Sequence, residues 1–115
     1  MTITHEDMVQ ALYAIRPGAE WSLEGDSYTG LRWDDQNQTQ PTEQEVLDAV
    51  ETGRMNLVRQ QRDTLLTQCD WTQVADAPLT TQQKADWATY RQALRDLPQT
   101  YQTAASVVWP ALPGM

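Results

Sequence analysis

The chain has 115 residues, of which 40% are hydrophobic and none is phenylalanine. This length suits one compact domain, or a small domain with an appendage, that buries a thin core. No apolar run approaches the roughly 20 residues of a membrane helix, and the N-terminus lacks the basic and apolar regions of a signal peptide. We therefore expect a cytoplasmic α+β protein that is mostly α-helical.

Charge divides the chain into two unequal halves. Residues 1–53 hold eleven acidic side chains and two arginines, a net charge of −9, whereas residues 54–115 hold five acidic and six basic side chains, a net charge of +1. An acidic front half disfavours binding to nucleic acid or to an anionic membrane. The second half carries three of the five tryptophans and is the better candidate for a protein contact, because Trp, Tyr and Arg are enriched at interfaces.

The first predicted element is a short helix. Thr4 can cap its start, with Asp7 at the second position of a capping box, and Pro17-Gly18 ends it. Apolar residues at helical spacing form one face, namely Met8, Ala11, Leu12 and Ile15. We expect this face to cover the element that follows.

That element is a β-hairpin between Ala19 and Trp33. A two-residue turn at Gly25-Asp26 would place Trp21 opposite Gly30 and split the apolar residues between both faces. We favour a three-residue loop, Gly25 to Ser27, because a half-buried hairpin needs one apolar face. This register pairs Leu23 with Thr29, Trp21 with Leu31, and Ala19 with Trp33.

A polar linker from Asp34 to Gln40 leads into a long helix. Asp34-Asp35 lacks the spaced oxygen ligands and the glycine of a calcium loop, so a solvated turn is expected there. Thr42 and Glu45 form a capping box for a helix over residues 43–68. The only helix-weakening residue inside it is Gly53. A break at Gly53 competes with one continuous helix, and we favour the continuous helix.

A loop from Asp70 to Leu79, closed by Pro78, precedes a second long helix that Thr80 caps with Gln83. Pro98 is expected to end this helix, and residues 107–113 are expected to be extended because of their prolines. A clean apolar stripe follows the helix, formed by Trp87, Tyr90, Leu94 and Leu97. Such a stripe is by default intramolecular core. The chain thus divides into a helix and hairpin head (1–40), a connecting helix (41–68) and a helical module with an extended tail (69–115).

Catalytic chemistry has little support in the sequence. His5 is the only histidine and lies far in sequence from Cys69, the only cysteine, so neither a nucleophilic triad nor a multi-cysteine metal site is expected. No phosphate loop, dinucleotide fingerprint or zinc spacing occurs. We predict no catalytic residue, no cofactor and no metal, and we expect Cys69 to be buried.

With little support for catalysis, the sequence favours a surface that binds another protein. A short helical hairpin and an extended tail can hardly bury every aromatic ring, so some rings should anchor a partner. Trp87 is expected inside, and Trp71 and Trp109 are expected outside. The predicted partner-binding residues are Asp70, Trp71, Tyr90, Arg91, Arg95, Trp109 and Pro110.

The second half resembles a known family. Its motifs are Arg62-Asp63-x-Leu65-Leu66, Asp70-Trp71-Thr72-Gln73, Asp76-Ala77-Pro78-Leu79-Thr80, the run from Trp87 to Pro98, and Val108-Trp109-Pro110. In this order they resemble the C-terminal module of phage tail fibre assembly proteins, or tail assembly chaperones. In the front half, Ala11-Leu12-Tyr13, Pro17-Gly18-Ala19, the hairpin and Gln40-Pro41-Thr42-Glu43 are similar to XkdW-like phage proteins.

The resemblance implies a phage factor that binds a tail fibre near its distal, C-terminal part and helps it fold or assemble, without catalysis or ATP. It implies action in the host cell cytoplasm, with several copies per trimeric fibre or a homo-oligomer of the factor itself. An alternative is a structural component that stays on the fibre or baseplate of the mature virion. A third functional hypothesis is an acidic inhibitor that mimics nucleic acid. The acidic charge of the first half is consistent with it, but the tryptophan-rich half gives it no support.

Overall fold

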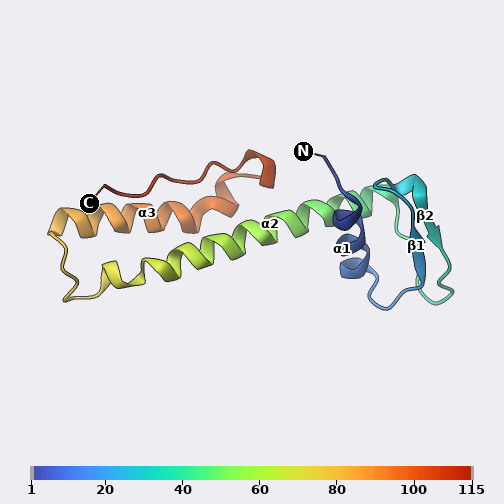
Figure 1. Ribbon diagram of the computed structural model, residues 1–115, viewed down its shortest axis with the longest axis horizontal. Helices are drawn as coiled ribbons and strands as arrows, with labels where there is room; N and C mark the ends of the chain where they lie inside the picture. Colours follow the sequence, from blue (N-terminus) through green and yellow to red (C-terminus); the bar gives the residue numbers. More distant parts are fainter. Residues whose placement is uncertain (1, 115) are drawn as a thin grey trace. The chain divides into compact units, whose positions relative to one another are not determined.

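The computed structural model describes residues 2–114 and has an α+β fold that is mostly helical, as predicted (Figure 1). The helices are α1 (His5–Ile15), α2 (Glu43–Gln68) and α3 (Thr81–Thr100), and a two-stranded sheet consists of β1 (Trp21–Leu23) and β2 (Leu31–Trp33). Short 3₁₀ turns lie at Tyr28–Gly30, Asp70–Gln73 and Ala104–Ser106. Among residues 2–114, none of the helices is both long and apolar enough to cross a membrane.

The chain forms two compact units, Met1–Arg54 and Met55–Met115. The boundary falls inside α2, so the first part of this helix belongs to one core and its last part to the other. As favoured from the sequence, α2 is continuous through Gly53. The two cores are made by different sets of residues.

In the first unit, α1 begins with the predicted capping box between Thr4 and Asp7. Its apolar face packs against the start of α2 and the inner face of the hairpin. The buried cluster consists of Met8, Ala11, Leu12, Val46 and Val50. At the end of this unit, Arg54 Nη2 on α2 donates to Asp7 Oδ2 at 2.7 Å and to the Thr2 carbonyl at 2.8 Å. This pair ties α2 to the first turn of α1.

The hairpin has a different register from the one predicted. Trp21 lies opposite Trp33 and Leu23 opposite Leu31, so the three-residue loop is wrong. The loop instead spans residues 25–29, and Glu24 N–H donates to the Gly30 carbonyl at 3.0 Å. A Cβ atom at Gly30 would lie 1.8 Å from the Glu24 carbonyl oxygen, so this close crossing requires glycine. The single apolar face is confirmed, because Trp21, Leu23, Leu31 and Trp33 all pack on the first core.

The linker between β2 and α2 is held by specific hydrogen bonds. Asp35 accepts backbone N–H bonds from Gln38, Glu20 and Asn37 at 2.8, 2.9 and 2.7 Å. These bonds, that from Gln38 first, hold the pKa of Asp35 below its usual value. Trp33 Nε1 donates to the Gln38 carbonyl at 2.9 Å, which anchors the linker to the sheet.

In the second unit, the last part of α2 and all of α3 pack as a helical hairpin. Thr80 caps α3 in a capping box with Gln83, as predicted. The buried cluster contains Cys69 and the predicted stripe, Trp87, Tyr90, Leu94 and Leu97. Pro98 does not end the helix, which continues to Thr100. Proline so near the C-terminus removes only one intrahelical bond, and Tyr101 N–H still reaches the Leu97 carbonyl at 3.1 Å.

Candidate partner-binding surface

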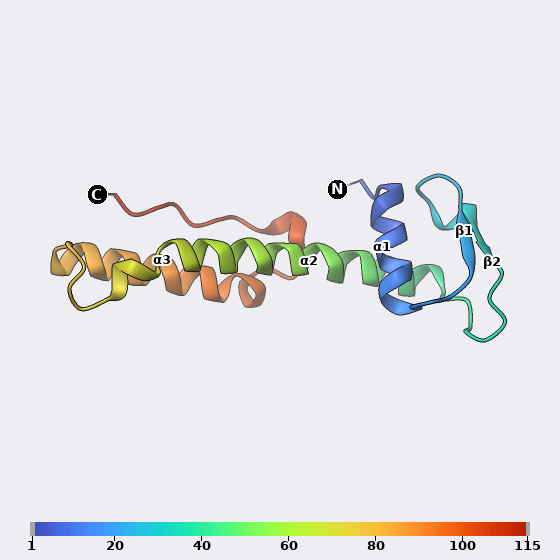
Figure 2. The same cartoon turned by 60° about the horizontal axis from the view of Figure 1, so that its bottom comes forward.

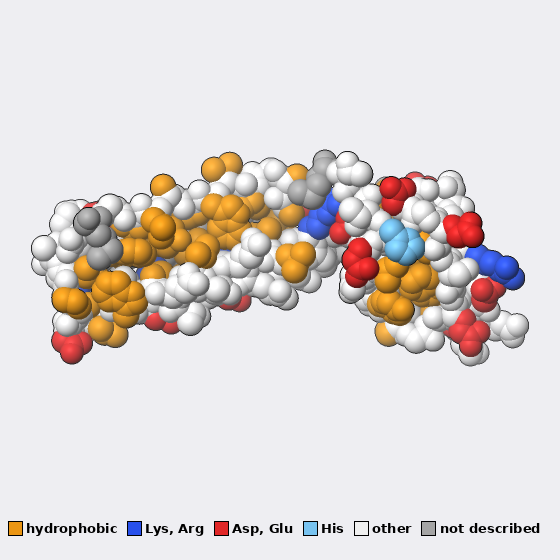
Figure 3. Space-filling model, in the orientation of Figure 1, with side chains coloured by type: hydrophobic (Ala, Val, Ile, Leu, Met, Phe, Trp, Pro, Cys, Tyr) orange, Lys and Arg blue, Asp and Glu red, His pale blue; other side chains and the backbone are white. Residues whose placement is uncertain are grey.

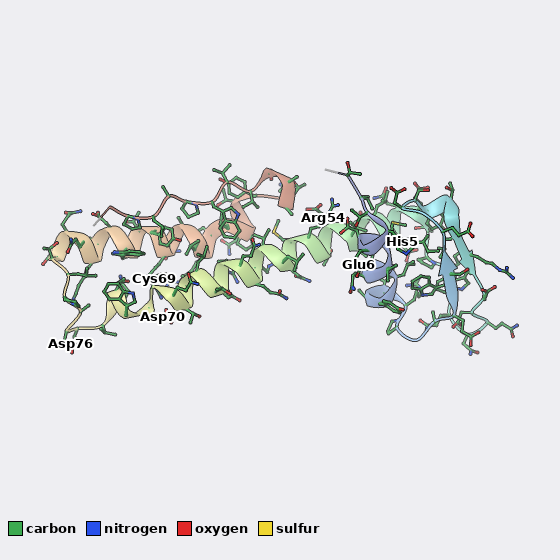
Figure 4. The ribbon with its side chains drawn as sticks, in the orientation of Figure 1. His5, Glu6, Arg54, Cys69, Asp70 and Asp76 are labelled. Carbon is green, nitrogen blue, oxygen red and sulfur yellow. The ribbon has the colours of Figure 1, made fainter. Side chains whose placement is uncertain are left out.

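The turn between α2 and α3 is organised by a buried arginine. Arg91 projects from α3 and donates to the Leu66 carbonyl at 2.8 Å, to Cys69 Sγ at 3.1 Å and to Asp70 Oδ1 at 2.8 Å. Carbonyls in the last turn of a helix lack intrahelical partners, so the guanidinium caps α2 from outside. Burial acts to lower the pKa of Arg91, but its hydrogen bonds with Asp70 and Cys69 outweigh this and raise it. Figure 4 shows Cys69 and Asp70 at this end of α2.

The Asp70-Trp71-Thr72-Gln73 motif is largely a device for making this turn. The buried Thr72 hydroxyl donates to the Cys69 carbonyl at 2.6 Å. Gln73 Nε2 donates to Thr72 Oγ1 at 3.1 Å and to the Lys84 carbonyl at 3.3 Å. Asp70, Thr72 and Gln73 are thus engaged within the unit. Trp71 is the member of the motif that exposes a large apolar side chain, with 45% of its surface exposed.

The aromatic pair on α3 is part of the core. The rings of Trp87 and Tyr90 meet edge to face, with centroids 5.6 Å apart. Burial raises the pKa of the Tyr90 hydroxyl, and the nearby Cys69 adds to this effect. These rings therefore stabilise the unit, as predicted for the stripe.

The tail of the second unit returns along the helices. Figures 1 and 2 show it, in red, beside α3 and the last part of α2. Val107 packs on the second core, and Trp109 lies over α2, where it lines an open groove of about 330 Å³ with Gln61, Thr64 and Leu65. Val108 and Leu112 are each 68% exposed, and Trp109 is 37% exposed. The tail thus adds apolar side chains to the surface of this unit.

The predicted partner-binding residues divide into two groups. Trp71, Arg95 and Trp109 are exposed, Pro110 is half-buried, and Asp70 is exposed although paired with Arg91. Tyr90 and Arg91 are buried, so they shape the surface without forming much of it. The burial of Tyr90 could be predicted from the apolar stripe on its helix. The Arg91–Asp70 pair joins residues 21 positions apart, so no local sequence pattern predicts it.

Sequence reasoning missed several exposed apolar residues of the second unit. They are Leu57 on α2, Val74 after the motif, and Val108 and Leu112 in the tail. For Val108 and Leu112 a signal existed, because Pro110 and Pro113 favour an extended segment that cannot bury both of its faces. Figure 3 shows hydrophobic side chains gathered over this unit, and a smaller hydrophobic patch among the acidic side chains of the first.

Nothing in residues 2–114 brings three or more His, Cys, Asp or Glu side chains together in a group that could hold a metal ion. The candidate site is a surface with exposed apolar side chains. Residues 55–114 match the family described as phage tail assembly chaperone protein. This match covers more than half of the chain, which belongs to the phage tail assembly chaperone family and so has a role in phage tail assembly.

The chain is also similar to a protein of known structure. A protein from Chromobacterium violaceum, CV0426, has a known solution structure and 41% sequence identity to this chain. The match covers 76% of this chain and 93% of that protein, with a TM-score of 0.46. The search of curated proteins finds no match. The similarity of the front half to XkdW-like proteins stays a prediction.

Proposed function

We propose that this protein is a tail fibre assembly chaperone, which binds the fibre through its second unit and promotes fibre folding or assembly without catalysis. One observation carries the proposal: the family match and the exposed apolar surface coincide. Of the large apolar side chains exposed in residues 2–114, all but Tyr13 lie within residues 55–114. They are Leu57, Trp71, Val74, Val108, Trp109 and Leu112.

Physical chemistry supports a fibre as the partner. An incomplete trimeric fibre rich in β-strands exposes strand edges and apolar surface, and both promote aggregation. Apolar anchors on a chaperone can cover such surface until the fibre closes. Trp71 and Trp109 are the expected hot spots, because tryptophans dominate the binding energy of many interfaces. We expect binding near the distal, C-terminal part of the fibre, in the host cytoplasm, with several copies per trimer.

The first unit fits the complementary role of keeping the complex soluble. Residues 1–54 hold eleven acidic side chains and three arginines, a net charge of −8, whereas residues 55–115 hold five of each sign. A strong net charge opposes association between complexes. The neutral second unit can approach a fibre without a large electrostatic penalty.

Co-expression with the tail fibre of the same phage tests this proposal. The wild-type chain should co-purify with the fibre, and so should Tyr13→Ala, which removes an exposed aromatic ring from the first unit. The double variant Trp71→Ala/Trp109→Ala should bind at least about 30-fold more weakly. Circular dichroism should show unchanged helix content in both variants. Equal fibre binding by the double variant, with Tyr13→Ala defective, would refute binding through the second unit.

A further inference from the structure

The tail of the second unit has a three-residue period of burial. Val107, Pro110 and Pro113 are half-buried, while the residues between them are exposed. Three residues per turn is the period of a polyproline II helix, which proline favours. Pro110 and Pro113 also have the P-x-x-P spacing that places two prolines on one side of such a helix.

The two prolines face α3. Together with Ala111 and Gly114, they line an open groove of about 310 Å³ whose other wall is formed by Asp86, Thr89, Tyr90 and Ala93. An aromatic ring beside small side chains is the kind of surface on which P-x-x-P segments dock. We name these four residues of α3 the proline seat.

The tail lies against this seat but leaves open space beside it, and packing alone holds the tail there. The groove is open space between the tail and α3. In the described part of the chain, residues 108–114 make no hydrogen bond to the helices, and the last backbone bond before them joins Val107 N–H to the Ala104 carbonyl. A ligand with a side chain that extends into this open space toward α3 would gain contacts that the tail lacks.

We infer that the proline seat is a binding site for an extended P-x-x-P segment of a partner protein, and that the tail is its resident occupant. A tethered segment competes at an effective concentration of about millimolar, so the tail weakens binding of any other ligand in proportion to its occupancy. The tail thus makes the seat selective for ligands that fit better. This inference stands apart from the fibre proposal, because it concerns α3 beneath the tail and its test needs no fibre.

A labelled synthetic peptide with the sequence of residues 104–114 tests the inference on the full-length chain by fluorescence anisotropy. Pro110→Ala/Pro113→Ala in the protein should loosen the tail and so tighten peptide binding about 10-fold relative to the wild-type chain. Leu112→Ala is the matched control, since Leu112 is exposed and should leave peptide binding unchanged. Ala93→Arg, which fills the seat, should abolish binding, and circular dichroism should confirm that each variant is folded.

Three results would overturn the inference. The first is equal peptide affinity for the wild-type chain and the double proline variant, or no binding to either. The second is equal binding of a peptide whose two prolines are replaced by alanine. The third, from sedimentation of the full chain, is a dimer that the double proline substitution dissociates, because the occupant would then be the tail of a second copy.

Discussion

The two units of this protein fix their loops in the same way but differ in charge and in exposed apolar surface. Hydrogen-bonded polar side chains hold the loops of both units, as Asp35 does in the linker of the acidic first unit and Arg91 does at the turn of the second. The second unit has no net charge, and leaves Trp71, Val74 and Trp109 on its surface. The contrast supports the proposal that the second unit binds the partner while the first keeps the complex soluble.

Truncating a buried leucine of either core should have the largest effect and should distinguish the two units. Leu12 and Leu94 are both fully buried, one in each core, and replacing either with alanine should lower the free energy of unfolding by about 2–5 kcal/mol. We expect Leu94→Ala to lose fibre co-purification at temperatures that unfold the second core of this variant, and Leu12→Ala to retain it at the same temperatures. Chemical denaturation gives the stabilities. Loss of fibre binding by Leu12→Ala with retention by Leu94→Ala would contradict fibre binding through the second unit.

Replacing the buried arginine of the second unit should have the next largest effect on stability. Arg91→Ala removes the guanidinium bonds to the Leu66 carbonyl, Cys69 Sγ and Asp70 and leaves the Leu66 carbonyl with the Cys69 N–H as its backbone donor, so it should destabilise the chain by about 2 kcal/mol. Asp70→Asn is the milder control, because that side chain is largely exposed and can be hydrated. Thermal unfolding should show the larger loss for Arg91→Ala. An equal loss for both variants would mean that the ion pair, and not the capping of α2, stabilises the turn.

Acid should affect the first unit before the second. The pKa values of Asp7, Asp35 and Glu45 are lowered, chiefly by backbone hydrogen bonds from Thr4, Gln38 and Thr42. A lowered pKa means that the stabilisation is complete above the usual values of 3.8 and 4.5 and is lost as the pH falls through the folded-state values. Hydrogen exchange between pH 5 and pH 2.5 should show protection lost first in residues 2–54. Earlier loss in residues 55–114 would contradict this order, and Asp7→Asn should reduce the pH dependence.

The smallest expected effect is a gain. Gly53 lies within α2, and a Cβ atom there would meet nothing within 4 Å. Gly53→Ala should therefore raise the stability by about 0.5–1 kcal/mol, because alanine loses less backbone entropy in a helix. An unchanged or lower denaturation midpoint would indicate that α2 is not helical at this position.

Local signals predicted most of the elements but not how they meet. The capping boxes at Thr4 and Thr80 and the stripe on α3 act within a few residues, so the sequence contains all of the relevant information. The hairpin register depends on the close crossing at Gly30, which becomes visible only when the strands are paired. Among the site residues, Trp71 and Trp109 were correctly expected outside. Arg91 and Asp70 pair with each other across the helical hairpin, and their predicted contact with a partner stays a prediction.

The yield of soluble fibre trimer shows whether the second unit promotes assembly of the fibre. The fibre should be expressed alone, with the wild-type chain, with Tyr13→Ala and with Trp71→Ala/Trp109→Ala, and soluble trimer quantified by size-exclusion chromatography. We expect a high yield with the wild-type chain and with Tyr13→Ala, and a yield near that of the fibre alone with the double variant. A full yield with the folded double variant would contradict this role of the second unit.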